Sequence, residues 1–251
     1  MHFLRETAKR LIVGTGWEGP IKWAHFSLTG EKNSLYDWQT IQVMARVLRR
    51  DSNAIDVGAF QGGMLRHLFR LAPSGRHIAF EPVPENARRL ERAFPRARVH
   101  ACAVGDVQGN AMFYEALAHP ALSGLQRRAK DLPNEPVREI QVPLDTLDRR
   151  VPSDLPIAFV KVDVEGGELG VFRGGIETLR RNRPVVVFES GLGGADYFDT
   201  KPQEIFDLIS GDVGLRISLL GDWLAGQQPL ARDAFVDQFE NRHNFYFMAH
   251  P

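Results

Sequence analysis

The chain has 251 residues, 43% hydrophobic and 25% charged, which is the composition of a globular protein with a substantial core. Lysine plus arginine and aspartate plus glutamate both number 31, so no overall charge favours a nucleic-acid or anionic-membrane partner. The apolar stretch after the N-terminal basic residues, 11–13, is too short for a signal peptide or a membrane span, so we expect a cytoplasmic protein.

From residue 54 onward, short apolar runs alternate with helical patterns, which is typical of a mostly parallel sheet with crossover helices. Residues 1–50 differ in style, and we interpret them as an N-terminal helical cap, with one helix at 35–50, on a domain formed by residues 51–251. Strands are predicted at 54–57, 77–80, 99–104, 157–163, 184–189, 216–220 and 245–249. Further helices are predicted at 63–71, 85–94, 168–181 and 203–210.

Two connections differ from this alternation. Residues 105–156 carry Pro120, Pro133 and Pro136 and only short strand-like pieces, so we interpret them as a lid or substrate loop. No clear crossover helix separates the last two strands, which predicts an antiparallel hairpin at the edge of a seven-stranded α/β sheet. The single cysteine, Cys102, lies in an apolar run and is expected to pack in the core.

The strongest local signal is the sequence DVGAFQGG at 56–63, where a strand ends in an acidic residue and turns through glycines into a helix. Glycines let the backbone approach a ligand closely, and a helix N-terminus favours polar or anionic groups, so this turn predicts a nucleotide-like site. Phe60 occupies the place of the second glycine in the dinucleotide fingerprint G-x-G-x-x-G, which argues against NAD.

Acidic residues end several of the predicted strands. Glu81 follows Gly58 by 23 positions, near the offset at which a carboxylate binds ribose hydroxyls, although it could merely cap the strand end. Lys161, Asp163 and Glu165 would share one strand face at the edge where parallel sheets bind ligands. The alternative is a Lys161 salt bridge followed by an acidic helix start at Glu168. Asp56, Glu81, Asp163 and Glu189 thus end four strands and predict a functional rim.

Taken in order and spacing, these motifs resemble the FkbM family of methyltransferases, which have the Rossmann-like class I S-adenosylmethionine-dependent fold. The resemblance covers roughly residues 54–190 and rests on 56–59 with Gly62, 80–84 (FEPVP), 103–106 (AVGD), 144–148 (LDTLD), 161–168 (KVDVEGGE), 174–175 and 183–189.

The resemblance implies that S-adenosyl-L-methionine is the cofactor. It places Asp56 and Gly58 beside the methionine part, Glu81 at the ribose, and Gly105 and Asp106 near the adenine. Ala59, Gly62 and Asp163 belong to the same cofactor-binding motifs. One departure is Phe60, since the family commonly has asparagine there. A rim of carboxylates is compatible with the sulfonium cation of this cofactor, whereas it would repel the pyrophosphate of NAD.

Methylation of a hydroxyl requires removal of its proton. The candidates for this base are Asp163, Glu165, Glu189 and His119, with Lys161 in the same cluster, and our working hypothesis names Asp163 as base or acceptor-positioning group. His119, beside Pro120, is favoured as a solvated loop histidine. A divalent metal held by Asp163, Glu165 and Glu189 is conceivable, but the sequence does not require one.

The predicted acceptor is a hydroxyl on a small molecule, sugar or glycan, with nitrogen left open as the accepting atom. Its specificity is expected in residues 105–156 and in the cap. The cluster of Arg127, Arg128 and Lys130 could meet an anionic acceptor, but a solvated surface is favoured. The cap aromatics could stack on a sugar or simply pack a helix; they are Trp17, Trp23, Tyr36 and Trp38.

Three alternatives compete with this interpretation. An NAD-dependent oxidoreductase would need the same strand-turn-helix, but the chain lacks an obvious Tyr-x-x-x-Lys pair for hydride transfer. A non-catalytic binding scaffold could keep the fold without the chemistry. Nucleic-acid methylation is disfavoured by zero net charge and the lack of a basic stripe.

Overall fold

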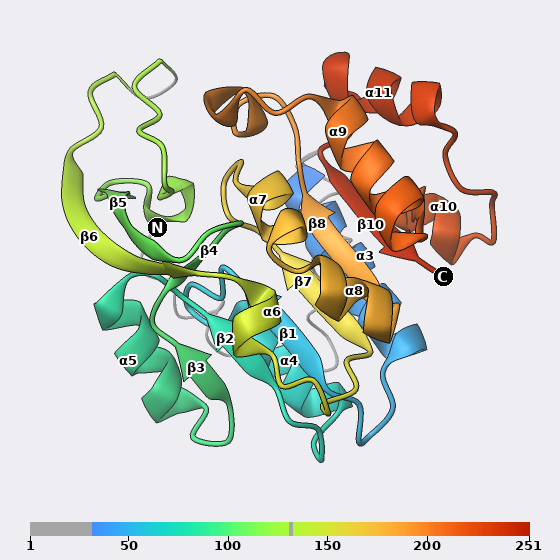
Figure 1. Ribbon diagram of the computed structural model, residues 1–251, viewed down its shortest axis with the longest axis horizontal. Helices are drawn as coiled ribbons and strands as arrows, with labels where there is room; N and C mark the ends of the chain where they lie inside the picture. Colours follow the sequence, from blue (N-terminus) through green and yellow to red (C-terminus); the bar gives the residue numbers. More distant parts are fainter. Residues whose placement is uncertain (1–31, 131–132) are drawn as a thin grey trace, which may run out of the picture.

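A seven-stranded sheet forms the middle layer of the protein, as seen in the computed structural model, which describes residues 32–130 and 133–251 (Figure 1). The strands lie in the order β3-β2-β1-β7-β8-β10-β9. Their bounds are β1 Ala54–Val57, β2 Ile78–Phe80, β3 Arg98–His100, β7 Phe159–Val162, β8 Val185–Glu189, β9 Arg216–Ser218 and β10 Tyr246–His250. Every pairing is parallel except those of β10, which is antiparallel to both β8 and β9. The mostly parallel seven-stranded α/β sheet is therefore confirmed.

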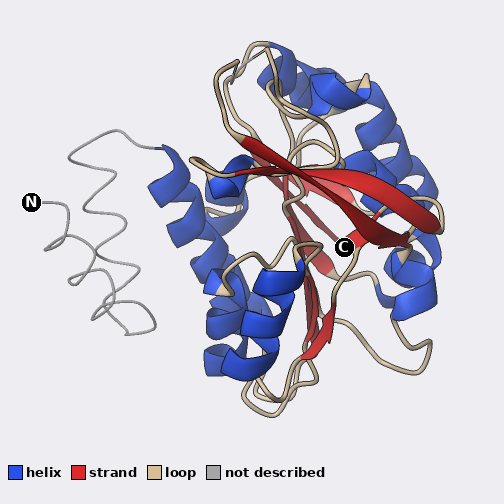
Figure 2. Cartoon of the chain, turned by 90° about the vertical axis from the view of Figure 1, so that its left-hand side faces the viewer, coloured by secondary structure: helices blue, strands red, loops and turns tan. Residues whose placement is uncertain are grey.

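Helices cover both faces of this sheet (Figure 2). One face packs against α3 (Lys32–Val47), α4 (Gly63–Leu71), α5 (Pro84–Ala93) and α10 (Leu220–Leu224). The other packs against α6 (Leu147–Arg150), α7 (Glu168–Arg173), α8 (Ile176–Asn182), α9 (Pro202–Phe206) and α11 (Arg232–Glu240). Because both faces are covered, the central strands β1 and β7 are buried along their whole length. Because these strands are buried, their sequences are apolar runs, and those runs allowed them to be predicted.

A second sheet extends from one end of the first. It has three strands in the order β4-β6-β5, with β4 at Ala103–Val104, β5 at Gly109–Ala116 and β6 at Val137–Asp145 (Figure 1). The expectation of only short strand-like pieces in residues 105–156 is wrong, since β5 and β6 form a long antiparallel pair. The prediction of one strand at 99–104 is also wrong. The chain leaves the main sheet after His100 and joins the small sheet at Ala103.

Two predicted helices also differ from the structure. The helix at 168–181 is divided into α7 and α8 at Gly174, where a Cβ atom would lie 1.9 Å from the carbonyl oxygen of Gly105. This close approach is a tertiary contact that helical spacing does not reveal. The helix at 203–210 is α9 continued by a π-helix, η3 (Asp207–Val213).

The C-terminal strands pair antiparallel as predicted, but no tight turn joins them, because α10 and α11 lie between β9 and β10. Two short 3-10 helices complete the described elements, η1 at Pro120–Leu122 and η2 at Ala195–Phe198. Over residues 32–130 and 133–251, every helix is too short or too polar to cross a bilayer.

Candidate functional site

A cavity of about 450 Å³ opens at the carboxyl ends of the parallel strands. The chain reaches it just after β1 at Gly58, after β2 at Glu81, after β7 at Asp163 and at the last residue of β8, Glu189. Tyr246, the first residue of the antiparallel strand β10, completes the same rim opposite Glu189. The topology therefore brings together residues that the sequence analysis placed at separate strand ends.

The glycine turn after β1 forms one wall of the cavity. Gly58 has φ of 80°, and a Cβ atom there would lie 1.8 Å from the carbonyl oxygen of Asp163. Only glycine allows this approach of β1 to the end of β7. Gly62 has φ of 79° and packs against the ring of Phe94, while Ala59 is buried in the core. Gly58 lines the cavity, whereas Ala59 and Gly62 shape the turn behind it.

Glu81 connects this turn to the second strand. Its Oε2 accepts a hydrogen bond from the backbone amide of Phe60 at 2.8 Å, and its Oε1 accepts one from the amide of Val83 at 3.0 Å. Asn86 Nδ2 donates a longer bond to Oε1 at 3.4 Å. Burial raises the pKa of Glu81, and these hydrogen bonds oppose the increase. The contact at Phe60 uses its backbone amide, so the aromatic side chain does not remove it.

Asp56 and Lys161 lie in the core beneath the cavity rather than in its lining. They are register partners across the β1–β7 pair and are 1% and 6% exposed. Burial raises the pKa of Asp56 to about 6, against the attraction of the Lys161 ammonium. The structure therefore places Asp56 in the interior, where it interacts with the Lys161 charge without a hydrogen bond to it.

Asp163 accepts hydrogen bonds from two side chains of the site. Lys161 Nζ donates to its Oδ2 at 2.6 Å, and the Tyr246 hydroxyl donates to the same oxygen at 2.9 Å. Burial alone would raise the pKa of Asp163, but the Lys161 ammonium and the hydrogen bonds hold it below its usual value. Asp163 is thus kept as a carboxylate. The salt bridge at Lys161 that the sequence analysis named as an alternative is present.

Tyr246 is a site residue that the sequence analysis missed. Its ring stacks on that of Tyr36 with centroids 5.0 Å apart, and the Tyr36 hydroxyl donates to Asn244 Oδ1 at 2.7 Å. The signal available was a tyrosine at the start of the last predicted strand, where an antiparallel strand begins at the rim.

The aromatic residues of the predicted cap have different outcomes. Tyr36 is a packing residue, Trp38 is half-buried, and Trp17 and Trp23 lie outside the described residues.

Glu165 and Glu189 complete an acidic cluster with Asp163. One carboxylate oxygen from each of the three lies within 4.8 Å of the others. Burial and the Asp163 charge raise the pKa of Glu165 to about 8, although Arg128 pairs with it at 2.5 Å. Burial, followed by repulsion from Asp163 and Glu165, raises the pKa of Glu189 well above its usual value.

This cluster has the oxygen ligands that a divalent cation would need. Lys161 and Arg128 already pair with two of its carboxylates, so cations supplied by the chain itself occupy part of it. Glu165 does not lie on the same strand face as Lys161, because β7 ends at Val162 and Glu165 has φ of 58° in the following turn.

Glu168 braces that turn from the first position of α7. Its Oε1 accepts hydrogen bonds from the amides of Val164 and Gly166, both at 3.1 Å. Burial raises the pKa of Glu168 to about 7. The residue is thus more than the acidic helix start that the sequence indicated.

The motif at 103–106 contributes to the cavity through its first half. Ala103 and Val104 line the cavity together with Cys102, whereas Gly105 is buried against Gly174 outside it. Asp106 is exposed and also lies outside the lining. Cys102 is buried, as predicted.

Residues 105–156 line the cavity with Phe113 and Glu115 of β5, with η1, and with Ser123 and Leu125 after it. His119 is exposed, with Nδ1 2.7 Å from Glu135 Oε2, and does not line the cavity. Arg127 and Lys130 are exposed, as expected for a solvated surface. That expectation is wrong for Arg128, whose side chain is only 16% exposed beside Glu165.

Comparisons with known proteins agree with this architecture. The model of the methyltransferase FkbM domain matches residues 56–216. The solved structure of methyltransferase FkbM from Methylobacillus flagellatus superposes with a TM-score of 0.51 at 16% identity, over 90% of this chain and 52% of that one. The chain therefore spans about half the length of that relative.

Two further solved structures have lower scores. A TehB-like SAM-dependent methyltransferase from Corynebacterium glutamicum has a TM-score of 0.42 at 11% identity, covering 92% of this chain and 93% of that one. SMU.1697c from Streptococcus mutans, solved in complex with SAH, has a TM-score of 0.45 at 10% identity, covering 84% and 96%. The comparison with curated proteins found no match. Because the family model covers more than half of the chain, the protein belongs to the FkbM methyltransferase domain family, with the Rossmann-like fold of class I methyltransferases.

Proposed function

We propose that this protein uses S-adenosyl-L-methionine to methylate a hydroxyl oxygen on a small molecule, sugar or glycan. The observation that carries the proposal is the shared lining of one cavity. Gly58 and Glu81, which suit a nucleoside, and Asp163 and Glu189, which suit proton transfer, all belong to this lining.

The cavity fits the cofactor in size and in chemistry. Its volume of about 450 Å³ lies within the range of small-molecule sites, roughly 300–1,000 Å³. Glu81 would accept hydrogen bonds from ribose hydroxyls, and the apolar residues Val83 and Val104 would pack on the adenine. When bound, S-adenosyl-L-methionine supplies an electrophilic methyl group on a sulfonium cation, whose charge the acidic rim complements.

Two acids of the rim would have different roles toward the acceptor, one positioning it and the other accepting its proton. Asp163 is held ionised by Lys161 and Tyr246, so it is a weak base and is suited to orient an acceptor hydroxyl. Glu189 has a raised pKa and, once ionised, is the stronger base. We assign proton acceptance to Glu189 and acceptor positioning to Asp163.

Isothermal titration with S-adenosylhomocysteine tests the cofactor assignment. The wild-type protein should bind one equivalent, and Glu81→Ala should abolish the binding because it removes the carboxylate between the glycine turn and α5. Glu85→Ala is the matched control, since Glu85 is an exposed acid of α5 outside the cavity lining. Absence of binding to the wild-type protein would refute the proposal.

The proton-transfer assignment needs a turnover measurement with labelled S-adenosyl-L-methionine and a pool of hydroxylated acceptors. Glu189→Gln should lower turnover by about 10²-fold or more, as is usual for loss of a general base. Asp163→Asn should also lower turnover, and both variants should keep their affinity for S-adenosylhomocysteine. Glu177→Gln on the surface of α8 serves as control. Unchanged turnover in either site variant would contradict its role.

Three expectations from the sequence accompany this proposal. We propose a cytoplasmic location, supported by a single buried cysteine that has no partner for an intramolecular disulfide. Cell fractionation tests it.

We propose no nucleic-acid partner, supported by zero net charge, and a filter-binding assay tests this. Residues 1–50 remain our proposed cap on the domain at 51–251, supported by the packing of α3 against α10 and α4.

A further inference from the structure

A second cavity of about 240 Å³ lies beside the first. The two share Asn33, Glu165 and Glu189 in their linings. The second is otherwise bordered by the turn before α7, by the loop at 190–195 after β8, and by Phe245. Glu189, to which we assign proton acceptance, therefore stands between the two cavities.

Two residues that line this second cavity carry buried polar atoms without a protein partner. Ser190 is 2% exposed, and its Oγ has no hydrogen-bond partner in residues 32–130 and 133–251. Glu168 is 1% exposed. Its Oε2 also has no hydrogen-bond partner within those residues, because both backbone amides that bond to Glu168 donate to Oε1. Buried polar groups are nearly always satisfied, so unpaired atoms at a cavity indicate that a ligand or water completes them.

The chemistry of the lining selects among ligand classes. Glu165, Glu168 and Glu189 line the cavity, and the cationic residue in its lining is Arg128. The guanidinium of Arg128 is paired with Glu165, which leaves little net attraction for an anion. Burial raises the pKa of Glu168 to about 7, so near neutral pH this carboxyl is available both as a hydrogen-bond donor and as an acceptor. Hydroxyl groups, which also donate and accept, match this lining.

The volume of the cavity and its aromatic lining limit the class of ligand further. The volume lies below the roughly 300–1,000 Å³ of pockets for drug-sized ligands, so it suits a single ring. Phe245 belongs to the lining, and its apolar side chain is of the kind on which a sugar ring packs.

We propose that the second cavity is the acceptor subsite and that it binds one neutral sugar ring, with Ser190 and Glu168 hydrogen-bonded to its hydroxyls. This inference rests on the proposed methyltransferase function and specifies its substrate class. Methylation would take place on the hydroxyl that lies nearest Glu189, where the two cavities meet.

The test is an NMR titration of the full chain saturated with S-adenosylhomocysteine. The probes are the methyl glycosides of glucose, mannose and rhamnose, with ethanolamine and magnesium chloride as alternative ligands. At least one glycoside should bind saturably and shift the amide signals of residues 190–195. Ser190→Ala should weaken its affinity at least about threefold, as expected for one hydrogen bond. Ser218→Ala, a buried serine on β9 bonded to His250, is the matched control and should leave the affinity unchanged.

The outcomes separate this inference from the function on which it rests. Failure to bind S-adenosylhomocysteine would refute the methyltransferase assignment itself. Normal binding of S-adenosylhomocysteine with no glycoside binding would overturn only the sugar subsite, as would glycoside affinities that Ser190→Ala leaves unchanged. Shifts at 190–195 with ethanolamine or magnesium instead would replace the sugar by an amine or a cation. Thermal melting of each variant verifies that it is folded.

Discussion

Replacing Lys161 by methionine should destabilise the protein strongly, and more at high pH than at low pH. Lys161 Nζ lies 2.6 Å from Asp163 Oδ2, and its side chain is 7% exposed. The same ammonium faces Asp56 across the strand pair. Removing one partner of a buried ion pair costs about 3–5 kcal/mol, because the remaining charge is left unpaired in the interior.

The pH dependence follows from the two acids that lose their cation. Without Lys161, the folded-state pKa of Asp56, already raised, rises further, and that of Asp163 rises above its unfolded value. An acid with a raised folded pKa stabilises the fold below its unfolded pKa, and that contribution is lost as the pH rises through the folded value. The loss should therefore be larger at pH 8 than at pH 5.

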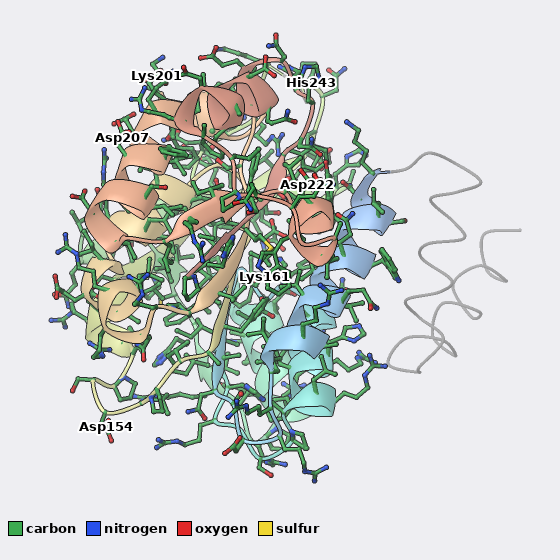
Figure 3. All side chains as sticks on the ribbon, turned by 90° about the vertical axis from the view of Figure 1, so that its right-hand side faces the viewer. Asp154, Lys161, Lys201, Asp207, Asp222 and His243 are labelled. Atoms are coloured by element: carbon green, nitrogen blue, oxygen red, sulfur yellow. The ribbon has the colours of Figure 1, made fainter. Side chains whose placement is uncertain are left out.

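Urea unfolding at these two pH values measures the effect. Lys201→Met is the control, since Lys201 lies exposed on the outside of the molecule (Figure 3) and should change the free energy of unfolding by less than about 0.5 kcal/mol. The double variant Lys161→Met, Asp163→Asn should recover part of the loss, because it also removes one of the unpaired charges. Equal losses at both pH values, or no recovery in the double variant, would refute the reasoning.

Three further predictions concern Gly58 in the glycine turn, the hydroxyl of Tyr246 and the carboxyl of Glu168. Gly58→Ala should cost more than the usual 1–2 kcal/mol or so of left-handed strain, because its Cβ would clash with the Asp163 carbonyl, and it should weaken S-adenosylhomocysteine binding in a titration. Gly63→Ala, with open space around the new methyl group, should do neither. Tyr246→Phe removes a bond to a charged carboxylate and should cost about 1.5–3 kcal/mol in urea unfolding; a cost near zero would contradict the assigned hydrogen bond. The pKa of Glu168, raised from 4.5 to about 7, should remove about 3 kcal/mol of stability as the pH rises through that interval. Glu168→Gln should flatten this slope in a pH series of unfolding curves, and an unchanged slope would count against the shift.

The elements that the sequence predicted best are those with both an apolar run and a local boundary signal. Strand β1 and helix α4 have the predicted bounds, because a buried apolar run and a glycine turn mark them locally. The boundary between β3 and β4 was missed. Both pieces belong to one apolar run, and the sheet change is set by β6, about forty residues further along the chain. The break at Gly174 likewise depends on contact with Gly105, which has no local signature.

In the candidate site too, some features have a local signal in the sequence and others depend on distant contacts. Glu81, Asp163 and Glu189 could be placed at one rim because parallel strands align their carboxyl ends. Their partners could not be placed. Arg128 is 37 positions from Glu165, and Tyr246 is 83 positions from Asp163, and neither separation leaves a pattern in the sequence.

Near and distant partners together give Asp163 and Glu189 different proton affinities. Lys161 and Tyr246 lower the pKa of Asp163, while Glu189 has a raised pKa beside it, so burial and like charge favour a proton on Glu189. Two carboxyls whose environments push their pKa values apart are suited to different roles. Residue types at the strand ends therefore predict an acidic rim. The assignment of one acid to positioning and another to proton transfer depends on contacts that only the folded chain provides.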